Sequence, residues 1–279
     1  MSKLPYSRAY VEITNICNRS CSFCPGTKRE LRSMTREEFG IVTDKLKPLT
    51  KYIYFHVMGE PLTHRELPLL ISDASSKGFN CAVTTNGTLL PKRGKEIVEA
   101  GVYKVNISVH SFEDGSLEDY LDYIKGCLDF ADYASRKGVL TVLRLWNKGY
   151  DKDRNLDTVA LMKEKFPEEW HYGPRGARIH DKLHLEYGDR FEWPDMEAEN
   201  FGDSVFCYGL KDHFGILSDG SIIPCCLDHE GDIRLGNAFT DDITAILSCE
   251  RAEKMKNGFS QRKATEELCR RCGYARRFG

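Results

Sequence analysis

The sequence predicts an α/β fold, in which a partial, open (β/α)6 TIM-like barrel is followed by a small cysteine-rich domain. Over the first 190 residues, runs rich in β-branched and aromatic residues alternate with helical patterns, which is typical of a parallel sheet with helices outside it. Beyond residue 190 this alternation stops, and cysteines gather toward the end of the chain. We therefore expect a barrel domain over residues 1–190 and a second domain over residues 191–279.

The expected strands are short and consist mainly of residues that favour extended backbone. They read AYVEIT, YIYFHV, NCAVTT, YKVNISV, VLTVLRL and KLHLE, over residues 9–14, 52–57, 80–85, 103–109, 139–145 and 182–186. Six strands are too few to close an eight-stranded barrel, so an open barrel is expected.

The stretches between these strands carry helical periodicity. Helices are expected over residues 35–46, 65–77, 92–100, 117–136 and 155–166. Thr35 and Glu38 have the spacing of a capping box at the start of the first helix. Residues 172–200 are instead rich in Gly, Pro, aromatic and charged residues, and we expect a linker or a loop over the functional site there.

Composition excludes several classes of protein. The 279 residues are 41% hydrophobic with a net charge of −2, so no general attraction to nucleic acid or to an anionic membrane is expected. No apolar run approaches the roughly 20 residues that span a bilayer, and the chain starts without the apolar stretch of a signal peptide. We expect a cytoplasmic protein. Because the cytosol keeps thiols reduced, its 11 cysteines are better explained as metal or cluster ligands than as disulfides.

The strongest motif follows the first expected strand, at the end of a barrel strand where catalytic groups lie. Cys17, Cys21 and Cys24 have the spacing C-x3-C-x2-C. Three thiolates can hold three irons of a [4Fe–4S] cluster and leave the fourth iron open to another molecule. From the spacing alone, the alternative is half of a zinc site completed by a ligand from elsewhere in the chain.

This motif resembles that of the radical S-adenosylmethionine (SAM) superfamily, and Phe23 stands where the family has an aromatic residue. The resemblance extends over about residues 8–190, with each element in the expected order. It implies that the amino and carboxylate groups of SAM bind the open iron, and that reductive cleavage of SAM gives a 5′-deoxyadenosyl radical. It also implies an electron donor of the flavodoxin or ferredoxin type.

The ends of the later strands supply further candidates for SAM binding. The stretch Met58-Gly59-Glu60-Pro61 resembles the glycine–glutamate motif whose backbone and acid hold the SAM amino group. The SAM-binding residues that the resemblance implies are Phe23, Met58, Gly59, Glu60, Pro61, Thr85, Asn86, Ser108, His110 and Arg144.

Several of these residues have an ordinary structural alternative. Gly-Glu-Pro and Asn-Gly are frequent in turns. On a strand, Ser108 and His110 point the same way, but His110 is as readily a core histidine with its hydrogen bonds satisfied. Arg144 stands among apolar residues of an expected strand and needs an anionic partner. That partner is the SAM carboxylate, a group of the substrate, or a carboxylate of the barrel itself.

A second group of cysteines lies in the last part of the chain. Cys207, Cys225, Cys269 and Cys272 provide four thiols, which suit either zinc or a closed [4Fe–4S] cluster. A hairpin is expected to turn at residues 218–221, just before Cys225. The G-x4-C that begins at Gly220 resembles the SPASM domain, and the four cysteines resemble its shortened form, the Twitch domain. The resemblance implies one auxiliary [4Fe–4S] cluster with no open iron.

Cys226 makes this assignment ambiguous because it directly follows Cys225. We assign Cys225, since it alone completes G-x4-C. The remaining cysteines, Cys81, Cys127 and Cys249, lie in or near expected strands and helices, where packing explains them.

The resemblance implies an enzyme, a radical SAM oxidoreductase that uses SAM and two [4Fe–4S] clusters. A closed auxiliary cluster can take an electron but cannot bind substrate through iron, which suits hydrogen abstraction and oxidation of a small polar substrate. Modification of a residue in a peptide or protein is one alternative, and an electron carrier or zinc-stapled binding protein is another. RNA modification is a further alternative, with the basic patch Arg270, Arg271, Arg276 and Arg277.

Overall fold

The computed structural model describes residues 4–113, 115–150 and 154–278. Its barrel part is a curved sheet of parallel strands, β1 (Arg8–Val11), β2 (Tyr52–Phe55), β3 (Asn80–Thr85), β4 (Lys104–Ser108), β5 (Leu140–Lys148) and β8 (Leu183–Asp189). They lie side by side in this order. Each coincides with one of the six strands expected from the sequence, so the α/β class and the partial barrel are confirmed.

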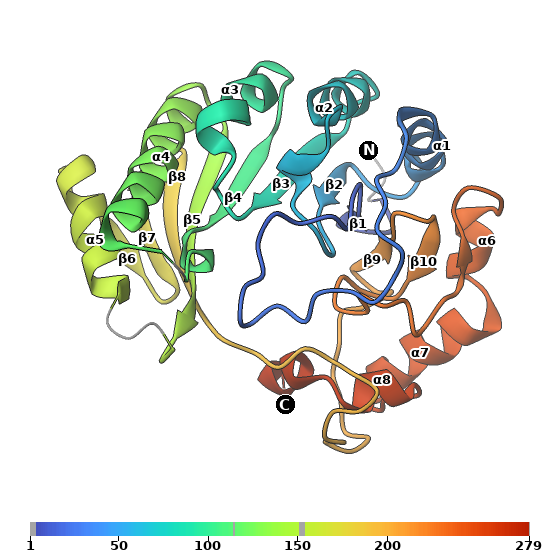
Figure 1. Cartoon of the computed structure of the whole chain (residues 1–279). Coiled ribbons are helices and arrows are strands. Elements are labelled where there is room, and N and C mark those ends of the chain that lie inside the picture. The colour runs from blue at the N-terminus through green and yellow to red at the C-terminus, as the bar shows by residue number, and fades with distance from the viewer. Residues whose placement is uncertain (1–3, 114, 151–153, 279) are drawn as a thin grey trace.

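Helices cover the outer side of this curved sheet (Figure 1), and they are α1 (Arg36–Leu46), α2 (Leu67–Ser76), α3 (Leu90–Glu99), α4 (Leu117–Arg136) and α5 (Arg154–Lys165). All correspond to expected helices. The Thr35 hydroxyl accepts from the backbone N–H of Glu38, and the Glu38 carboxylate accepts from the N–H of Thr35, so the capping box is confirmed.

Side chains alternate between the two faces of the sheet. Val11, Ile53 and Val83 point outward and are fully buried in the core beneath the helices. Tyr10 and Tyr54, their neighbours in the chain, point inward, where their rings contact each other. The outer face therefore holds the fold together, and the inner face is free to carry polar and aromatic groups.

The C-terminal part of the chain extends the same sheet on the other side of β1. Strand β9 (His213–Ile216) pairs in parallel with β1, and β10 (Ser221–Ile223) and β11 (Gly236–Asn237) follow antiparallel. Gly220 has a φ of +84°, which a hairpin turn requires, so the expected hairpin is confirmed. The chain ends in α6 (Ile243–Leu247), α7 (Glu250–Ser260), α8 (Glu267–Arg270) and the 3-10 turn η3 (Gly273–Phe278).

The expectation of a linker or loop over residues 172–200 is wrong for its first half. Strands β6 (His171–Gly173) and β7 (Gly176–His180) form a hairpin, and β7 continues antiparallel onto β8. The pattern of β6 concealed this strand because all three of its residues are exposed and no alternation marks it. The hairpin widens the sheet beyond β8 and leaves the barrel open.

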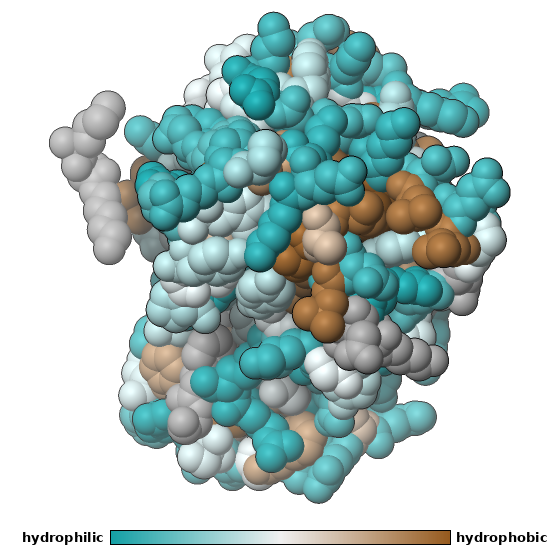
Figure 2. Space-filling view, turned by 90° about the vertical axis from the view of Figure 1, so that its left-hand side faces the viewer, coloured by the Kyte–Doolittle hydropathy of each residue, from teal (hydrophilic) through white to brown (hydrophobic). Residues whose placement is uncertain are grey.

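Figure 2 views the molecule from the side that carries α4 and α5. The surface is mainly hydrophilic, with one apolar patch, and Leu117, Leu121 and Leu156 are exposed on these two helices. In the described ranges, no helix combines the length and apolar character that crossing a membrane requires.

Candidate active site

The three N-terminal cysteines lie on the loop that follows β1. Cys17 and Cys24 are exposed and Cys21 is half-buried, with its Sγ 3.4 Å from the carbonyl oxygen of Ser111. The pKa of Cys21 is raised to about 11, chiefly by burial and then by the nearby Glu113 carboxylate and the other two thiols. The three thiols thus lie on one accessible loop, and a thiol gives up its proton when it binds a metal.

The donor set fits a cluster. In the described part of the chain, no three Cys, His, Asp or Glu side chains converge as tightly as they do around a single ion. A cubane cluster takes its thiolates at separate corners, so three cysteines spread along one loop suit it better than they suit a lone zinc ion.

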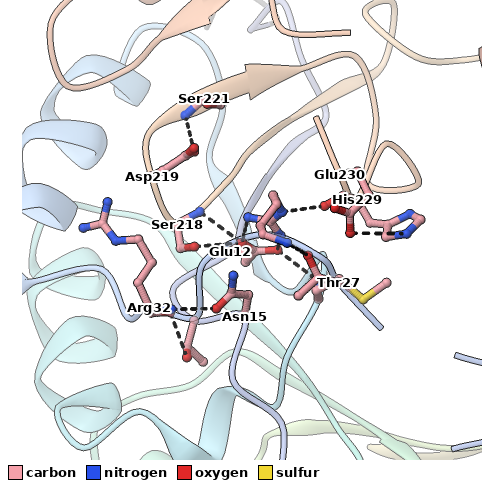
Figure 3. Close-up of polar contacts among 12 residues, drawn as sticks. Glu12, Asn15, Thr27, Arg32, Ser218, Asp219, Ser221, His229 and Glu230 are labelled. Atoms are coloured by element: carbon pink, nitrogen blue, oxygen red, sulfur yellow. Dashed lines mark hydrogen bonds and ion pairs between the residues drawn. The ribbon is translucent and has the colours of Figure 1, made fainter. Parts of the chain in front are cut away.

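A buried ion pair anchors this loop. The Glu12 carboxylate, fully buried at the end of β1, accepts from Nη1 and Nη2 of Arg29 at 2.8 and 2.7 Å. Ser218, which follows β9, donates to the same carboxylate from its N–H and its hydroxyl, at 3.1 and 2.9 Å (Figure 3). Met58 donates its N–H to Glu12 at 3.1 Å, and Arg29 donates to the carbonyl of His229 at 2.8 Å. Glu12 therefore joins the cysteine loop, the end of β2 and the C-terminal hairpin.

A second set of contacts closes the base of the loop (Figure 3). The Asn15 side chain accepts from the N–H of Arg32 at 2.8 Å and donates to the carbonyl of Glu30 at 2.9 Å. At the far side, the Glu230 carboxylate accepts from the N–H of Lys28 at 3.1 Å. The loop is thus fixed both to its own strand and to the C-terminal part of the chain. Sequence reasoning missed Glu12 and Arg29, although a glutamate inside the apolar run AYVEIT was a signal.

Gly59, in the expected SAM motif, is required by close packing of the backbone and not by the approach of a ligand. Gly59 has a φ of +77°, and a Cβ there would lie 2.4 Å from the carbonyl oxygen of Thr14. Glu60 donates its N–H to the carbonyl of Ile16 at 2.9 Å. The end of β2 therefore packs backbone to backbone against the start of the cysteine loop, and only glycine fits this approach.

Glu60 lies beneath this contact. Its carboxylate accepts from the N–H groups of Asn86 and Leu62 at 2.6 and 3.0 Å, and the residue is 2% exposed. Burial raises its pKa to about 7, against the opposing effect of those N–H groups. No Lys, Arg or His within residues 4–113, 115–150 and 154–278 pairs with it. A buried carboxylate with no cationic partner fits the amino group of SAM, whose N–H groups it can accept.

This geometry predicts a pH dependence of SAM binding. Because the pKa of Glu60 is raised to about 7, the carboxylate that accepts from the SAM amino group predominates only above that pH. We expect the affinity of the cluster-loaded protein for SAM to increase between pH 6 and pH 8, and Glu60→Gln to weaken it about tenfold or more and to remove the increase. Calorimetric titration at the two pH values measures both effects. The exposed variant Glu96→Gln is the control, and an unchanged pH profile in Glu60→Gln contradicts the assignment.

The other expected SAM residues lie at the same edge of the sheet, at the carboxyl ends of β3 and β4. Thr85 and Asn86 are buried, and the Asn86 amide donates to Asn18 at 2.9 Å and lies 4.0 Å from the Cys17 Sγ. Pro61 is buried at the first position of the 3-10 turn η1 (Pro61–Thr63), and Ser108 is half-buried at the last position of β4.

The expectation that Ser108 and His110 share one face of a strand is wrong. Strand β4 ends at Ser108, and His110 lies in the 3-10 turn η2 (Val109–Ser111). The Nδ1 of His110 lies 3.0 Å from the carbonyl oxygen of Arg144, and its ring contacts that of Phe23, with 5.1 Å between the ring centres. Burial lowers its pKa, which keeps it neutral. His110 thus connects the cysteine loop to β5, as a packed histidine does.

Arg144 has the partner within the barrel that the sequence left as one alternative. Its Nε donates to the Glu186 carboxylate at 3.3 Å, and its guanidinium lies 4.4 Å from the centre of the Trp146 ring. Burial lowers its pKa, and Glu186 acts in the opposite direction.

The C-terminal cysteines form a second group beside the hairpin. The pKa of Cys225 is raised well above its usual value by burial, and then by Cys207, Cys226, Cys272 and Cys269. Cys207 also accepts from the N–H of Gly209 at 3.3 Å.

Cys226 has different surroundings. Burial raises its pKa to about 12, and its thiol is hydrogen-bonded to the Tyr10 hydroxyl. It packs with Tyr10, Val57 and Ile223 on the inner face of the sheet. The structure therefore supports Cys225 as the cluster ligand and places Cys226 toward the barrel interior.

This difference predicts the outcome of two single substitutions. Cys225→Ala is expected to lower the iron content from about eight to about four per chain, whereas Cys226→Ala keeps about eight. Each single variant removes one of two adjacent thiols, so each serves as the control for the loss of packing in the other. Iron analysis and electron paramagnetic resonance after anaerobic reconstitution give the result. Loss of the second cluster from Cys226→Ala alone would show that the ligand is the other cysteine.

Comparison with known families identifies the class of protein that this fold and site define. The model of the radical SAM superfamily matches residues 11–173, more than half of the chain, and the chain belongs to that superfamily. The model of the SPASM iron–sulfur cluster-binding domain matches residues 207–273. The protein is thus a radical SAM enzyme with a SPASM/Twitch-type auxiliary domain, and it uses SAM and two [4Fe–4S] clusters.

The relatives are distant in sequence. A probable GTP 3′,8-cyclase of Pyrobaculum aerophilum is 24% identical over 253 residues, which cover 76% of this chain and 81% of the relative. The GTP 3′,8-cyclase of Staphylococcus aureus is 25% identical over 255 residues, covering 77% and 72%.

Two solved structures share the fold over nearly the whole chain. BtrN in complex with AdoMet and 2-DOIA has a TM-score of 0.63 at 20% identity, covering 98% of this chain and 94% of its own. The anSMEcpe structure with bound AdoMet has a TM-score of 0.64 at 14% identity, covering 95% and 88%.

Proposed function

We propose that this enzyme removes a hydrogen atom from a small polar molecule and completes an oxidation by passing a second electron to its auxiliary cluster. One observation carries the proposal: Cys225 lies among Cys207, Cys269 and Cys272, while Cys226 is turned away toward Tyr10. Four thiol ligands close a cubane, so this cluster is suited to electron transfer and not to holding a substrate on iron.

The chain's own residues prepare the first site for this reaction. Bound SAM and its cluster supply a 5′-deoxyadenosyl radical. The Glu12–Arg29 pair fixes the loop that carries Cys17, Cys21 and Cys24. Glu60 provides a buried carboxylate that accepts from the SAM amino group, and the inner face of the barrel is where the substrate would be positioned.

The known proteins support a small substrate without deciding the reaction. BtrN was solved in complex with 2-DOIA as well as AdoMet, and the cyclases that this chain resembles are named for GTP. A cyclisation leaves a substrate radical that must gain one electron, whereas an oxidation must give one electron up. Four thiols at the auxiliary site leave no iron to bind the substrate, which favours this cluster as the acceptor of that electron. Reduction of the first cluster requires an external electron donor, for which we propose a flavodoxin or ferredoxin.

The basic patch that RNA modification would use is already engaged. Arg270 forms ion pairs with Asp203 and Glu267, and Arg271 pairs with Glu267 as well. Arg276 and Arg277 lie over aromatic rings. Arginines held by carboxylates and rings are poorly placed to bind phosphates along an RNA, so this alternative loses support.

A deuterium-transfer experiment tests the substrate class. The cluster-loaded enzyme is given SAM, dithionite and a uniformly deuterated cell extract, separated into a small-molecule fraction and a peptide and protein fraction. Hydrogen abstraction moves one deuterium into 5′-deoxyadenosine, which mass spectrometry detects. We expect the transfer from the small-molecule fraction. Transfer from the peptide and protein fraction alone would contradict the proposal and favour a peptide-modifying enzyme.

A further inference from the structure

Three polar atoms on the inner face of the barrel lack a partner. In the described part of the chain, Nδ1 of His56, Oδ1 of Asn106 and Nε1 of Trp146 are out of contact with solvent and make no hydrogen bond. The neighbours Phe55, Ile107 and Leu145 are buried in the outer core, so the strand alternation turns these three side chains inward. Buried polar atoms without partners are rare, and each of these three leaves a hydrogen bond that a bound molecule can complete.

Arg144 is held rigidly on the same inner face of the sheet. The Trp146 ring supports its guanidinium from one side, and Trp146 itself packs on Gly188, where a Cβ would lie 2.8 Å from the indole ring. Its one ion pair, with Glu186, uses Nε. Neither terminal amino group of Arg144 has a partner among the described residues. A guanidinium fixed in this way presents two donors to a planar or tetrahedral anion.

Lys104 adds an uncompensated positive charge. It is half-buried on β4 with its side chain inward, and no ion pair forms with it in the described ranges. Burial lowers its pKa, followed by the effect of Arg144, and the Glu186 carboxylate acts in the opposite direction. Lys104 lines a groove of about 610 Å3 together with Val142, Glu186 and the β6–β7 hairpin.

The charges on the inner face do not balance. Arg8 pairs with Asp212 at 3.0 Å and Arg144 with Glu186 at 3.3 Å, and Lys104 remains. His56 does not add charge, because burial and the nearby arginines lower its pKa to about 3. The inner face therefore carries an excess positive charge among the described residues, and such a charge favours the binding of an anion.

We propose that the inner face of β2, β4 and β5 is a subsite for an anionic group of the substrate, a phosphate or a carboxylate. Arg144 and Lys104 supply the charge, and His56 and Asn106 hydrogen-bond the adjoining polar part. The inference rests on the proposed function, because it takes the barrel interior as the place where substrate meets the radical. It narrows the substrate to molecules that carry an acid group.

The test titrates the cluster-loaded, SAM-saturated protein with pyrophosphate, with malonate and with the neutral polyol inositol. Calorimetry measures each affinity. One of the two anions is expected to bind, pyrophosphate for a phosphorylated substrate or malonate for a carboxylate, and inositol is not. Lys104→Met should weaken anion binding about tenfold or more, and Lys104→Arg should restore most of it. Arg136→Met, which removes an exposed arginine of α4, is the matched control and should change nothing.

Several results would overturn the subsite. The first is that inositol binds and neither anion does. The second is that Lys104→Met and the wild-type protein bind the anion equally well. The third is that the anion displaces SAM, which would assign Arg144 to the SAM carboxylate. SAM cleavage by the wild-type protein with dithionite is measured alongside. If it occurs while no anion binds, the subsite is wrong and the enzyme class stands. If SAM is not cleaved, the proposed function has failed.

Discussion

Glu12→Ala is expected to lower the free energy of unfolding by about 3–5 kcal/mol, because it leaves the Arg29 guanidinium buried without its carboxylate. The pair is bidentate, and the side chains of Glu12 and Arg29 are 0% and 9% exposed. The same substitution also removes the acceptor of the N–H groups of Met58 and Ser218. Urea denaturation under anaerobic conditions, followed by circular dichroism and by the visible absorbance of the clusters, measures the loss.

Two comparisons make this prediction specific. Arg36→Ala removes the exposed bidentate pair with Asp73 and should change the free energy of unfolding far less. Glu12→Gln keeps the shape of the side chain and one acceptor oxygen, so its loss should fall between the two. If Glu12→Ala were no more destabilising than Arg36→Ala, the carboxylate would not be the anchor between the cysteine loop and the C-terminal hairpin.

The sequence was sufficient to predict the elements that are determined by residues close together in the chain. The outward positions of the six barrel strands are apolar because they meet helices, and Thr35 with Glu38 determines where α1 begins. The spacing of Cys17, Cys21 and Cys24 likewise indicated the first cluster site, since these three cysteines lie on one loop. These features depend on neighbours a few residues away, which a pattern contains.

The features that were missed depend on partners far along the chain. Glu12 meets Ser218 across 206 positions, and no spacing connects them. The strand β6 was hidden because it is an exposed edge strand that pairs with β7, and no alternation of burial marks it. His110 was expected on a strand because the run YKVNISV continues past Ser108, but the chain turns there so that His110 can reach β5. The resemblance named the SAM residues without showing that Gly59 serves the packing of β2 on the cysteine loop.

The second large effect concerns the separate roles proposed for the two clusters, SAM cleavage at the first and electron transfer at the second. Changing Cys17, Cys21 and Cys24 together to alanine should remove about half of the iron and abolish SAM cleavage, because SAM needs an open iron at the first site. Changing Cys269 and Cys272 together should also remove about half of the iron. The second variant should keep SAM cleavage, since the four thiols of the auxiliary site leave no iron open.

Loss of a cluster also removes folding free energy, so both variants must first be shown to be soluble. In the variant of Cys269 and Cys272, the electron paramagnetic resonance signal of the first cluster and its shift on addition of SAM establish that the first site is intact. Iron analysis shows that only one cluster is lost. With these controls, a change in SAM cleavage reports on the chemistry and not on misfolding.

The most direct measurement is the rate of 5′-deoxyadenosine formation by the Cys269→Ala, Cys272→Ala double variant, with SAM and dithionite and without substrate. We expect a rate of SAM cleavage close to that of the wild-type protein. In a second assay with the deuterated small-molecule fraction, we expect the variant to form none of the oxidised product that the wild-type enzyme forms. If the intact variant cannot cleave SAM, the auxiliary cluster is not the separate electron acceptor described here. If the variant forms full product, the cluster is a structural support and the proposed oxidation is contradicted.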